Sequence, residues 1–186
     1  MSNIKLAIVG ATGAVGREFL RILAEQQFPA ENLFLVASSK SAGKAIKYFE
    51  KIIEIEDLQL FDFSKASVAF FSAGSSVAES HASQAIEKGC TVIDNSSFFR
   101  NRDDLELIVP EVNGSRLEDL NLPAIIANPN CSTAQMVVAL KPFHDLFNIK
   151  RVDVATYQSV SGTGQSASEE LKDCLLYTSP SPRDDR

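Results

Sequence analysis

A glycine-rich turn directly follows the first apolar segment of the chain. Residues 4–9 form an apolar run broken only by Lys5, and Gly10, Gly13 and Gly16 come next in a GxxGxxG pattern. Continuous apolar runs suit parallel strands that are covered by helices on both faces. Glycine at these three positions permits a tight turn, a close backbone approach to a ligand and close packing of the following helix. The start of the chain therefore predicts the opening of a doubly wound α/β fold.

Strand and helix patterns alternate after this turn. Helices are predicted over 13–27, 75–88 and 131–147, the last with a kink at Pro142, and buried strands over 33–37, 68–73, 91–93 and 124–127. Alternating apolar and acidic residues between 46 and 60 favour an exposed or antiparallel strand. Alternate apolar residues over 152–157 predict a strand of a second domain, followed by a glycine-containing turn and a helix from about Ser166.

Composition argues against several classes of function. The chain has 186 residues and a net charge of -6, and its 18 Lys and Arg residues are dispersed. Nucleic-acid binding needs clustered cations, so we expect no nucleic-acid partner. No apolar run approaches membrane-spanning length and no leader precedes the first strand, which predicts a cytoplasmic protein without a membrane partner. Three cysteines without CxxC spacing favour neither a disulfide framework nor a metal site.

The glycine turn is a candidate nucleotide-binding site. The free amides at the start of the helix after Gly13 suit the pyrophosphate of a dinucleotide, although the pattern also fits an ordinary glycine turn of an α/β protein. An NAD site places an acidic residue at the end of the second strand. Here Ser38, Ser39, Lys40 and Ser41 occupy that end. Hydroxyls and a cation suit a 2′-phosphate, so the sequence predicts NADP rather than NAD.

Cys131 follows the polar run Asn128-Pro129-Asn130 at a predicted strand-to-helix turn. Cysteine reacts as its thiolate, and the partial positive charge at a helix N-terminus favours that form. A nucleophilic cysteine beside a nucleotide site suits reduction or oxidation of an aldehyde through a thioester. The alternative is a structural cysteine in a non-catalytic nucleotide-binding module. Cys90, between Gly89 and a buried strand, is expected to be a packing residue, and Cys174 receives no role.

Seven ordered motifs resemble the amino-terminal half of the aspartate-semialdehyde dehydrogenase family. They are GATGAVG, SSKSAGK, SAGSS, DNSSFFR, VPEVNG, ANPNCST and YQSVSGTGQ, and the resemblance covers residues 4 to about 173. It implies a Rossmann-type NADP-binding domain over 1–130, followed by the beginning of an α+β catalytic (dimerisation) domain over 131–174. The implied reaction is NADPH-dependent reductive dephosphorylation of L-aspartyl 4-phosphate to L-aspartate 4-semialdehyde, a step towards lysine, threonine and methionine.

The resemblance also implies roles for individual residues. Cys131 would be the nucleophile that forms the acyl thioester, Arg100 would hold the phosphate, Gln158 would orient the substrate and Asn130 would orient the acyl group. The positions that match NADP contacts are Thr12, Gly13, Ala14, Val15, Lys40, Ser41, Ser161 and Gly162, beside Gly10 of the turn. The forked donors of Arg100 fit a phosphoryl group, whereas the alternative is a solvated charge beside Arg102.

The chain departs from this family in its length. Members are almost twice as long, form homodimers or homotetramers, and carry their acid-base histidine and substrate-carboxylate arginine in the half that does not match. His81 and His144 lie outside the matching motifs and are expected to be ordinary surface histidines. We therefore expect a truncated dehydrogenase with an unrelated, disordered tail over 175–186, weak NADP binding and no meaningful turnover by this chain alone.

Overall fold

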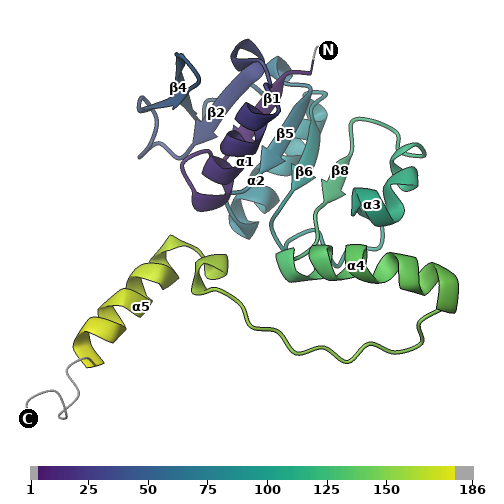
Figure 1. The fold of residues 1–186 in the computed structure, drawn as a ribbon. Helices are drawn as coiled ribbons and strands as arrows, with labels where there is room; N and C mark the ends of the chain where they lie inside the picture. The colour runs from purple at the N-terminus through teal and green to yellow at the C-terminus, as the bar shows by residue number, and fades with distance from the viewer. Residues whose placement is uncertain (1–3, 179–186) are drawn as a thin grey trace, which may run out of the picture. The chain divides into compact units, whose positions relative to one another are not determined.

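A computed structural model describes residues 4–178 of the chain (Figure 1). The chain divides into two compact units, 1–150 and 151–186. The first unit holds one mixed sheet with helices packed on it. The second holds a short 3₁₀ turn, Val160–Thr163, and the helix α5, Gln165–Thr178. The predicted boundary between residues 130 and 131 rests on the family resemblance and stays a prediction.

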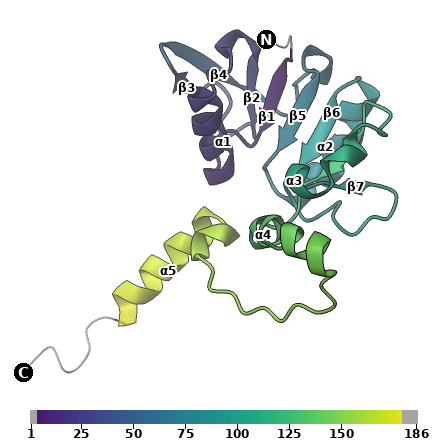
Figure 2. The same ribbon diagram turned by 45° about the vertical axis from the view of Figure 1, so that its right-hand side comes forward.

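The sheet of the first unit has eight strands in the order β3-β4-β2-β1-β5-β6-β8-β7, with β3 and β7 at its two edges (Figure 2). The strands are β1 Leu6–Val9, β2 Leu33–Ala37, β3 Ala45–Tyr48, β4 Lys51–Asp57, β5 Val68–Phe71, β6 Thr91–Asp94, β7 Glu106–Leu107 and β8 Ile125–Ala127. Neighbouring strands run parallel except β3 and β4. The chain moves outward from β1 to β2 and β4, then returns to β5 on the other side of β1. This order confirms the predicted doubly wound α/β fold.

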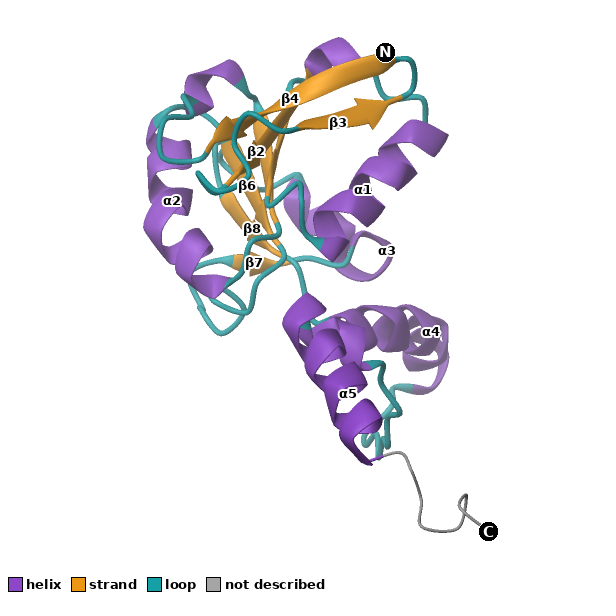
Figure 3. Cartoon of the chain, turned by 90° about the vertical axis from the view of Figure 1, so that its left-hand side faces the viewer, coloured by secondary structure: helices purple, strands orange, loops and turns teal. Residues whose placement is uncertain are grey.

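Helices cover both faces of the sheet. The helix α1, Ala14–Glu25, and the helix α2, Ser75–Glu87, lie on opposite sides of it (Figure 3). Leu6 and Ile8 of β1 belong to the apolar cluster that contains Leu20 of α1. The alternate residues Ala7 and Val9 belong to the cluster that contains the buried alanines of α2. Because successive side chains of a strand point to opposite faces, the continuous apolar run of β1 supplies both cores.

Most predicted elements are present where the sequence places them. The helix α4, Cys131–Phe147, covers the predicted range and contains Pro142, and β2 has the predicted bounds. The segment between 46 and 60 forms part of the antiparallel β3–β4 hairpin. Its end, Ile55–Asp57, also pairs in parallel with β2, which joins the hairpin to the main sheet. Two short elements between β6 and β8 lacked a prediction, β7 and the single-turn helix α3, Pro110–Asn113.

The strand predicted over 152–157 is wrong. This segment of the second unit is exposed along its length and has no strand partner among the described residues. Its alternating Val152 and Val154 fit a strand, but a strand also needs a neighbour to satisfy its backbone donors and acceptors. The helix expected from about Ser166 is confirmed as α5, and it continues past Leu175 to Thr178. The remainder of the predicted tail, 179–186, lies outside the described residues.

Candidate active site

The glycine turn forms at the carboxyl end of β1 and is tied to both neighbouring strands. The amides of Gly10 and Ala11 donate to the carbonyl of Val36 in β2, over 2.8 and 3.2 Å. On the other side, the amide and hydroxyl of Ser72, just after β5, donate to the carbonyl of Val9 over 2.8 and 3.0 Å. Gly10 has a φ of +91°, a conformation that side chains disfavour. The chain therefore turns at Gly10, immediately after Val9 makes the last pairs of β1 with β2 and β5.

Backbone crowding leaves no space for side chains inside this turn. A Cβ on Gly10 would lie 2.9 Å from the carbonyl carbon of Ser72, and one on Gly16 would lie 2.3 Å from the carbonyl oxygen of Gly10. The close approach of Gly16 packs the start of α1 against the turn. No side chain caps the N-terminal amides of α1, and Gly13 to Val15 are exposed. These amides are a ready site for an anion such as a pyrophosphate.

The predicted 2′-phosphate position lies at the carboxyl end of β2, next to β1 in the sheet. Residues 38–41 form a turn in which the amide of Ser41 donates to the carbonyl of Ser38 over 2.8 Å. The side chain of Lys40 is exposed, and Ser41 is half-buried. The glycine turn and this turn therefore lie side by side at the carboxyl ends of two adjacent parallel strands, β1 and β2. We call this side of the sheet its carboxyl edge. A dinucleotide binds at such an edge, where the strand order reverses.

The loop after β6 is tightly organised around a buried carboxylate. Asp94 is fully buried and accepts hydrogen bonds from the amide and hydroxyl of Ser96, over 3.1 and 2.7 Å. The Ser96 hydroxyl in turn accepts from the amide of Phe98 over 3.1 Å. These bonds shape the loop that carries Arg100. The Arg100 guanidinium donates from Nε to the carbonyl of Asn128 and from Nη2 to the carbonyl of Asn95, over 2.9 and 3.0 Å.

Cys131 is the first residue of α4, after the short loop that leaves β8. It is exposed, and Asn130 caps the helix because its Oδ1 accepts from the amide and hydroxyl of Ser132, over 3.0 and 2.6 Å. The Cys131 Sγ lies 3.9 Å from the same Oδ1. Cys90 differs in every respect, since it is fully buried and burial raises the pKa of its thiol to about 11. The expectation that Cys90 packs in the core is confirmed.

Three of the predicted site residues lie in the second unit. Gln158 donates from Nε2 to the hydroxyl of Thr156 over 3.1 Å, and Ser161 contacts Ser159 through both its amide and its hydroxyl. Ser159 caps the 3₁₀ turn because its Oγ accepts from the amide of Ser161 over 3.3 Å, and the amide of Gly162 donates to the Ser159 carbonyl over 3.1 Å. The other predicted residues share the carboxyl edge of the sheet in the first unit, and the roles of both groups stay predictions.

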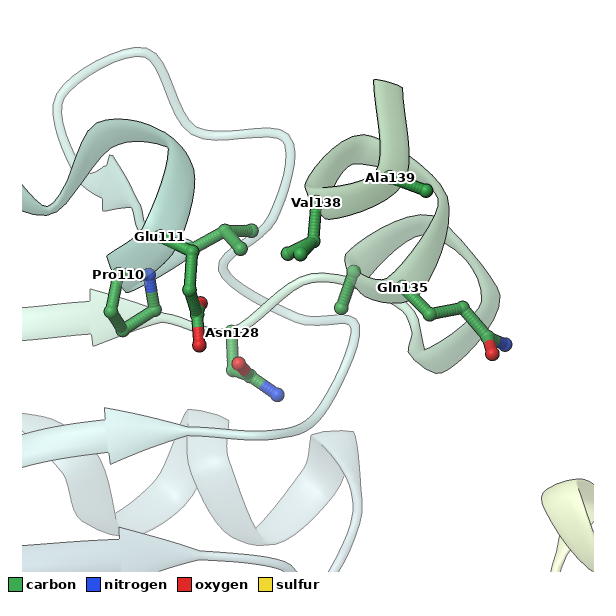
Figure 4. Close-up of a pocket in the computed structure, with 8 residues that line it drawn as sticks. Pro110, Glu111, Asn128, Gln135, Val138 and Ala139 are labelled. Atoms are coloured by element: carbon green, nitrogen blue, oxygen red, sulfur yellow. The ribbon is translucent and has the colours of Figure 1, made fainter. Parts of the chain in front are cut away.

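A pocket of about 450 Å³ opens beside this edge, between α3 and α4 (Figure 4). Val109, Pro110 and Glu111 line it from α3 and the residue before it, Asn128 from the end of β8, and Ala134, Gln135, Val138 and Ala139 from α4. Most of this lining is apolar. The side chains of Glu111, Asn128 and Gln135 add polar groups. On the α4 side, the lining residues lie between positions 134 and 139.

A family model for the NAD binding domain of semialdehyde dehydrogenases matches residues 5–120. The chain belongs to the semialdehyde dehydrogenase family. The aspartate-semialdehyde dehydrogenase of Legionella pneumophila is 52% identical over 169 residues, which are 91% of this chain and 49% of that protein. The Campylobacter jejuni enzyme is 49% identical over 173 residues, 92% of this chain and 50% of that protein. The resemblance predicted from the seven motifs is confirmed, and the chain spans about half the length of these relatives.

Solved structures of semialdehyde dehydrogenases agree with this assignment. Aspartate semialdehyde dehydrogenase II of Vibrio cholerae, solved in complex with ASA, matches with a TM-score of 0.88 and 45% identity, over 93% of this chain and 52% of that one. The Candida albicans enzyme, solved with NADP, matches with a TM-score of 0.62 and 28% identity, over 80% of this chain and 48% of that one. The family domain on this chain is therefore a nucleotide-binding domain of the dehydrogenase type.

Asn95 and Asn128 are site-edge residues that sequence reasoning left without a role, although both stand in motifs of this dehydrogenase family. Each directly follows a buried parallel strand, a placement that brings polar side chains to the ligand-binding edge of a sheet. That placement was the available signal. Among the described residues, no group of His, Cys, Asp and Glu side chains is suited to hold a metal ion. Over the same part of the chain, no helix has the length and apolar content needed to span a membrane.

Proposed function

We propose that this chain is the nucleotide-binding and nucleophile-bearing half of an aspartate-semialdehyde dehydrogenase. The observation that carries the proposal is the position of Cys131: it is exposed, it begins α4, and it follows a strand of the same parallel sheet whose edge carries the glycine turn. A thiol and a nucleotide site on one sheet edge suit acyl reduction through a thioester. The whole enzyme would serve the route from aspartate to lysine, threonine and methionine.

The nucleotide site fits NADP. The crowded turn at Gly10 and Gly16 would let the backbone approach a ligand closely, and the uncapped amides of α1 would suit its pyrophosphate. At the end of β2, the cation of Lys40 and the hydroxyl of Ser41 suit a 2′-phosphate, and residues 38–41 include no carboxylate to repel it. When bound, NADPH supplies the hydride that reduces the acyl group. In the second unit, Ser161 and Gly162 are proposed to add contacts to the cofactor.

The thiol of Cys131 carries the covalent chemistry in this proposal. Its thiolate attacks the acyl carbon of aspartyl phosphate, the bond from that carbon to the phosphate oxygen breaks, and inorganic phosphate leaves. The product is a thioester on Sγ. After reduction of the acyl carbon, the carbon-sulfur bond breaks, the semialdehyde is released and the thiolate is restored. The partial positive charge at the start of α4 stabilises sulfur whenever it is anionic in this cycle.

Arg100 is proposed to hold the phosphoryl group of the substrate. Its Nε and Nη2 each donate to a backbone carbonyl, so the guanidinium is fixed in place, while Nη1 retains its hydrogens for an oxyanion. Asn130 is proposed to orient the acyl group, because it stands beside Sγ and is itself fixed by its cap on α4. Gln158 of the second unit is proposed to orient the substrate.

Site-resolved alkylation tests this proposal. We would treat the chain with iodoacetamide and measure the rate at each cysteine by peptide mass spectrometry, dividing each rate by the rate of the same cysteine in denaturing urea. Cys174 is the matched control, because it is exposed like Cys131 but lies on α5. We expect the normalised rate of Cys131 to exceed that of Cys174 about tenfold, and aspartate semialdehyde to protect Cys131 alone.

Two results together would contradict the proposal. If Cys131 and Cys174 react equally and the semialdehyde protects neither, the thiol is not activated and does not lie in a substrate site. The chain would then be a nucleotide-binding module without acyl chemistry. Binding of NADPH, followed by the change in its own fluorescence, separates that outcome from a chain that fails to fold.

A further inference from the structure

We infer that Asn95 and Asn128 act together with Arg100 as a clamp that positions the loop leading to Cys131. This inference rests on the proposed function, because the loop that it positions leads to Cys131, the proposed nucleophile. We use the name asparagine clamp for Asn95, Asn128 and Arg100. Asn95 and Asn128 are positioning residues in this inference, because they act through the loop that carries the thiol.

Three hydrogen bonds make up the asparagine clamp. The side-chain amide Nδ2 of Asn128 donates to Oδ1 of Asn95 over 2.6 Å. Arg100 binds the backbone of the same two residues: its Nε donates to the carbonyl of Asn128 over 2.9 Å, and its Nη2 donates to the carbonyl of Asn95 over 3.0 Å. Bonds to the charged guanidinium are stronger than neutral ones. The loop after β6 and the loop after β8 are thus joined by side chains as well as by the sheet.

The base of the clamp is fixed by the sheet itself. The amide of Asn95 donates to the carbonyl of Phe71 in β5 over 2.9 Å, and the amide of Asn128 donates to the carbonyl of Asp94 in β6 over 2.8 Å. Asp94 is fully buried and holds Ser96 of the next turn. Each asparagine therefore stands on a rigid strand end. The clamp adds side-chain hydrogen bonds to the loops after β6 and β8, beyond the last backbone hydrogen bonds of the sheet.

Only two residues separate Asn128 from Cys131. Pro129 is buried and has no amide hydrogen to donate, and Asn130 is already used as the cap of α4. The direction in which the chain enters α4 is therefore set at Asn128. Figure 4 shows Asn128 between the end of β8 and the first turns of α4. Without the clamp, the first turn of α4 gains freedom, and its amides stabilise the Cys131 thiolate less well.

Alkylation of Cys131 in clamp variants tests this inference on the chain as it exists. The variants are Asn128→Ala, Asn95→Ala and the double variant, and Asn101→Ala is the matched control, because Asn101 is exposed in the same loop outside the clamp. At neutral pH we expect each clamp variant to alkylate at Cys131 about 3- to 10-fold more slowly, as loss of one net hydrogen bond implies. The double variant should equal the single ones, because both remove the same bond. Asn101→Ala should leave the rate unchanged.

The pH dependence separates positioning from a general loss of stability. Near pH 10, well above the ordinary pKa of a cysteine thiol, the clamp variants and the parent chain should react at similar rates. A lower melting temperature with an unchanged alkylation rate at neutral pH would overturn the inference, and so would additive effects of the two substitutions. If Asn128→Ala does not fold, Asn95→Ala tests the same bond from the other loop.

This experiment distinguishes failure of the clamp from failure of the proposed function. Alkylation needs neither cofactor nor substrate, so a slower reaction in the variants supports the clamp even if Cys131 carries no acyl group. Conversely, protection of Cys131 by the semialdehyde in the parent chain, together with unchanged alkylation in the variants, would retain the proposed function and remove the clamp from it.

Discussion

At the scale of single residues, Gly10 shows how a turn can be constrained twice. Its φ of +91° disfavours any side chain, and a Cβ would lie 2.9 Å from the Ser72 carbonyl carbon and 3.0 Å from the Ala73 amide nitrogen. Both neighbours are backbone atoms of the segment after β5, so neither can rotate away. Gly43 has a similar φ of +78° but open space around its Cα. A side chain at Gly43 would therefore meet backbone strain alone, whereas one at Gly10 would meet both strain and steric crowding.

Replacing these glycines by alanine should give different losses of stability. Gly43→Ala is expected to lower the free energy of unfolding by about 1–2 kcal/mol, the cost of a left-handed alanine. Gly10→Ala adds the overpacking of a closed site, about 1–3 kcal/mol more. Urea unfolding of the two variants beside the parent chain measures this difference. Equal losses would mean that the turn relaxes freely and that crowding at Gly10 carries no cost.

Burial of Cys90 predicts a loss of stability at alkaline pH. Because burial raises the pKa of the Cys90 thiol to about 11, the folded chain keeps a proton that the unfolded chain releases near pH 8.5–9. The contribution of this thiol is fully present below about pH 8.5 and is lost as the pH rises to 11, by roughly 2–3 kcal/mol.

The variant Cys90→Ala isolates this effect of pH. Any stability advantage of the parent chain over the variant should shrink as the pH rises from 8 to 11, as measured by urea unfolding at each pH. Burial also raises the pKa of Tyr48, but Tyr48 is present in both proteins and its contribution cancels in the difference. A constant difference across this range would show that Cys90 ionises as easily in the folded chain as in the unfolded one.

At the scale of elements, the start of α4 combines a structural and a chemical role. Asn130 caps the helix through Oδ1, and the same atom lies 3.9 Å from the Cys131 Sγ. An aspartate at position 130 would keep the accepting oxygen but add a negative charge beside the sulfur. An alanine would remove the cap. These two substitutions therefore separate the contribution of the cap from the local charge that the thiol experiences.

We expect Asn130→Asp to retain stability and Asn130→Ala to lose about 1 kcal/mol of unfolding free energy, the usual value of an N-cap. Alkylation of Cys131 should become slower in Asn130→Asp, because the added charge disfavours the thiolate. Thermal unfolding and alkylation at neutral pH measure the two effects, with Asn101→Ala as the control. Faster alkylation of Asn130→Asp would show that charge beside Sγ does not govern its reactivity.

Sequence reasoning predicted correctly those helices and strands whose pattern of residues lies within the element and at its two ends. The helix α1 and the strand β2 follow from apolar period and from a glycine turn or proline at their ends. The segment 152–157 has a strand pattern but no partner strand among the described residues. The pattern of one segment does not show whether another strand is available to pair with it. The clamp between Asn95 and Asn128 escaped for a similar reason, because the two residues are 33 positions apart and meet only through the sheet.

At the scale of the whole molecule, no histidine lies near the proposed nucleophile Cys131 at the carboxyl edge of the sheet. The sequence has two histidines, and neither stands at the carboxyl edge of the sheet. His81 lies within α2, where its Nε2 is 3.4 Å from the side-chain Nε2 of Gln59 and its Nδ1 is 3.4 Å from the side-chain Oε1 of Gln84. His144 lies in the last turn of α4. Apolar side chains near the end of α4, Phe143, Leu146 and Phe147, are exposed. The chain spans about half the length of the curated relatives it matches.

We therefore expect this chain to bind NADP weakly and to consume no NADPH in the presence of aspartyl phosphate. Proton transfer by a positioned side chain is commonly worth about 10² to 10⁴ in rate, and neither His81 nor His144 is placed to perform it at Cys131. The absorbance of NADPH, followed with the full-length Legionella pneumophila enzyme as a positive control, measures turnover. Stoichiometric release of phosphate without NADPH consumption would fit a Cys131 that forms the thioester, whose acyl carbon is then not reduced. Sustained NADPH consumption that Cys131→Ser abolishes would show instead that residues 1–186 contain the complete catalytic set.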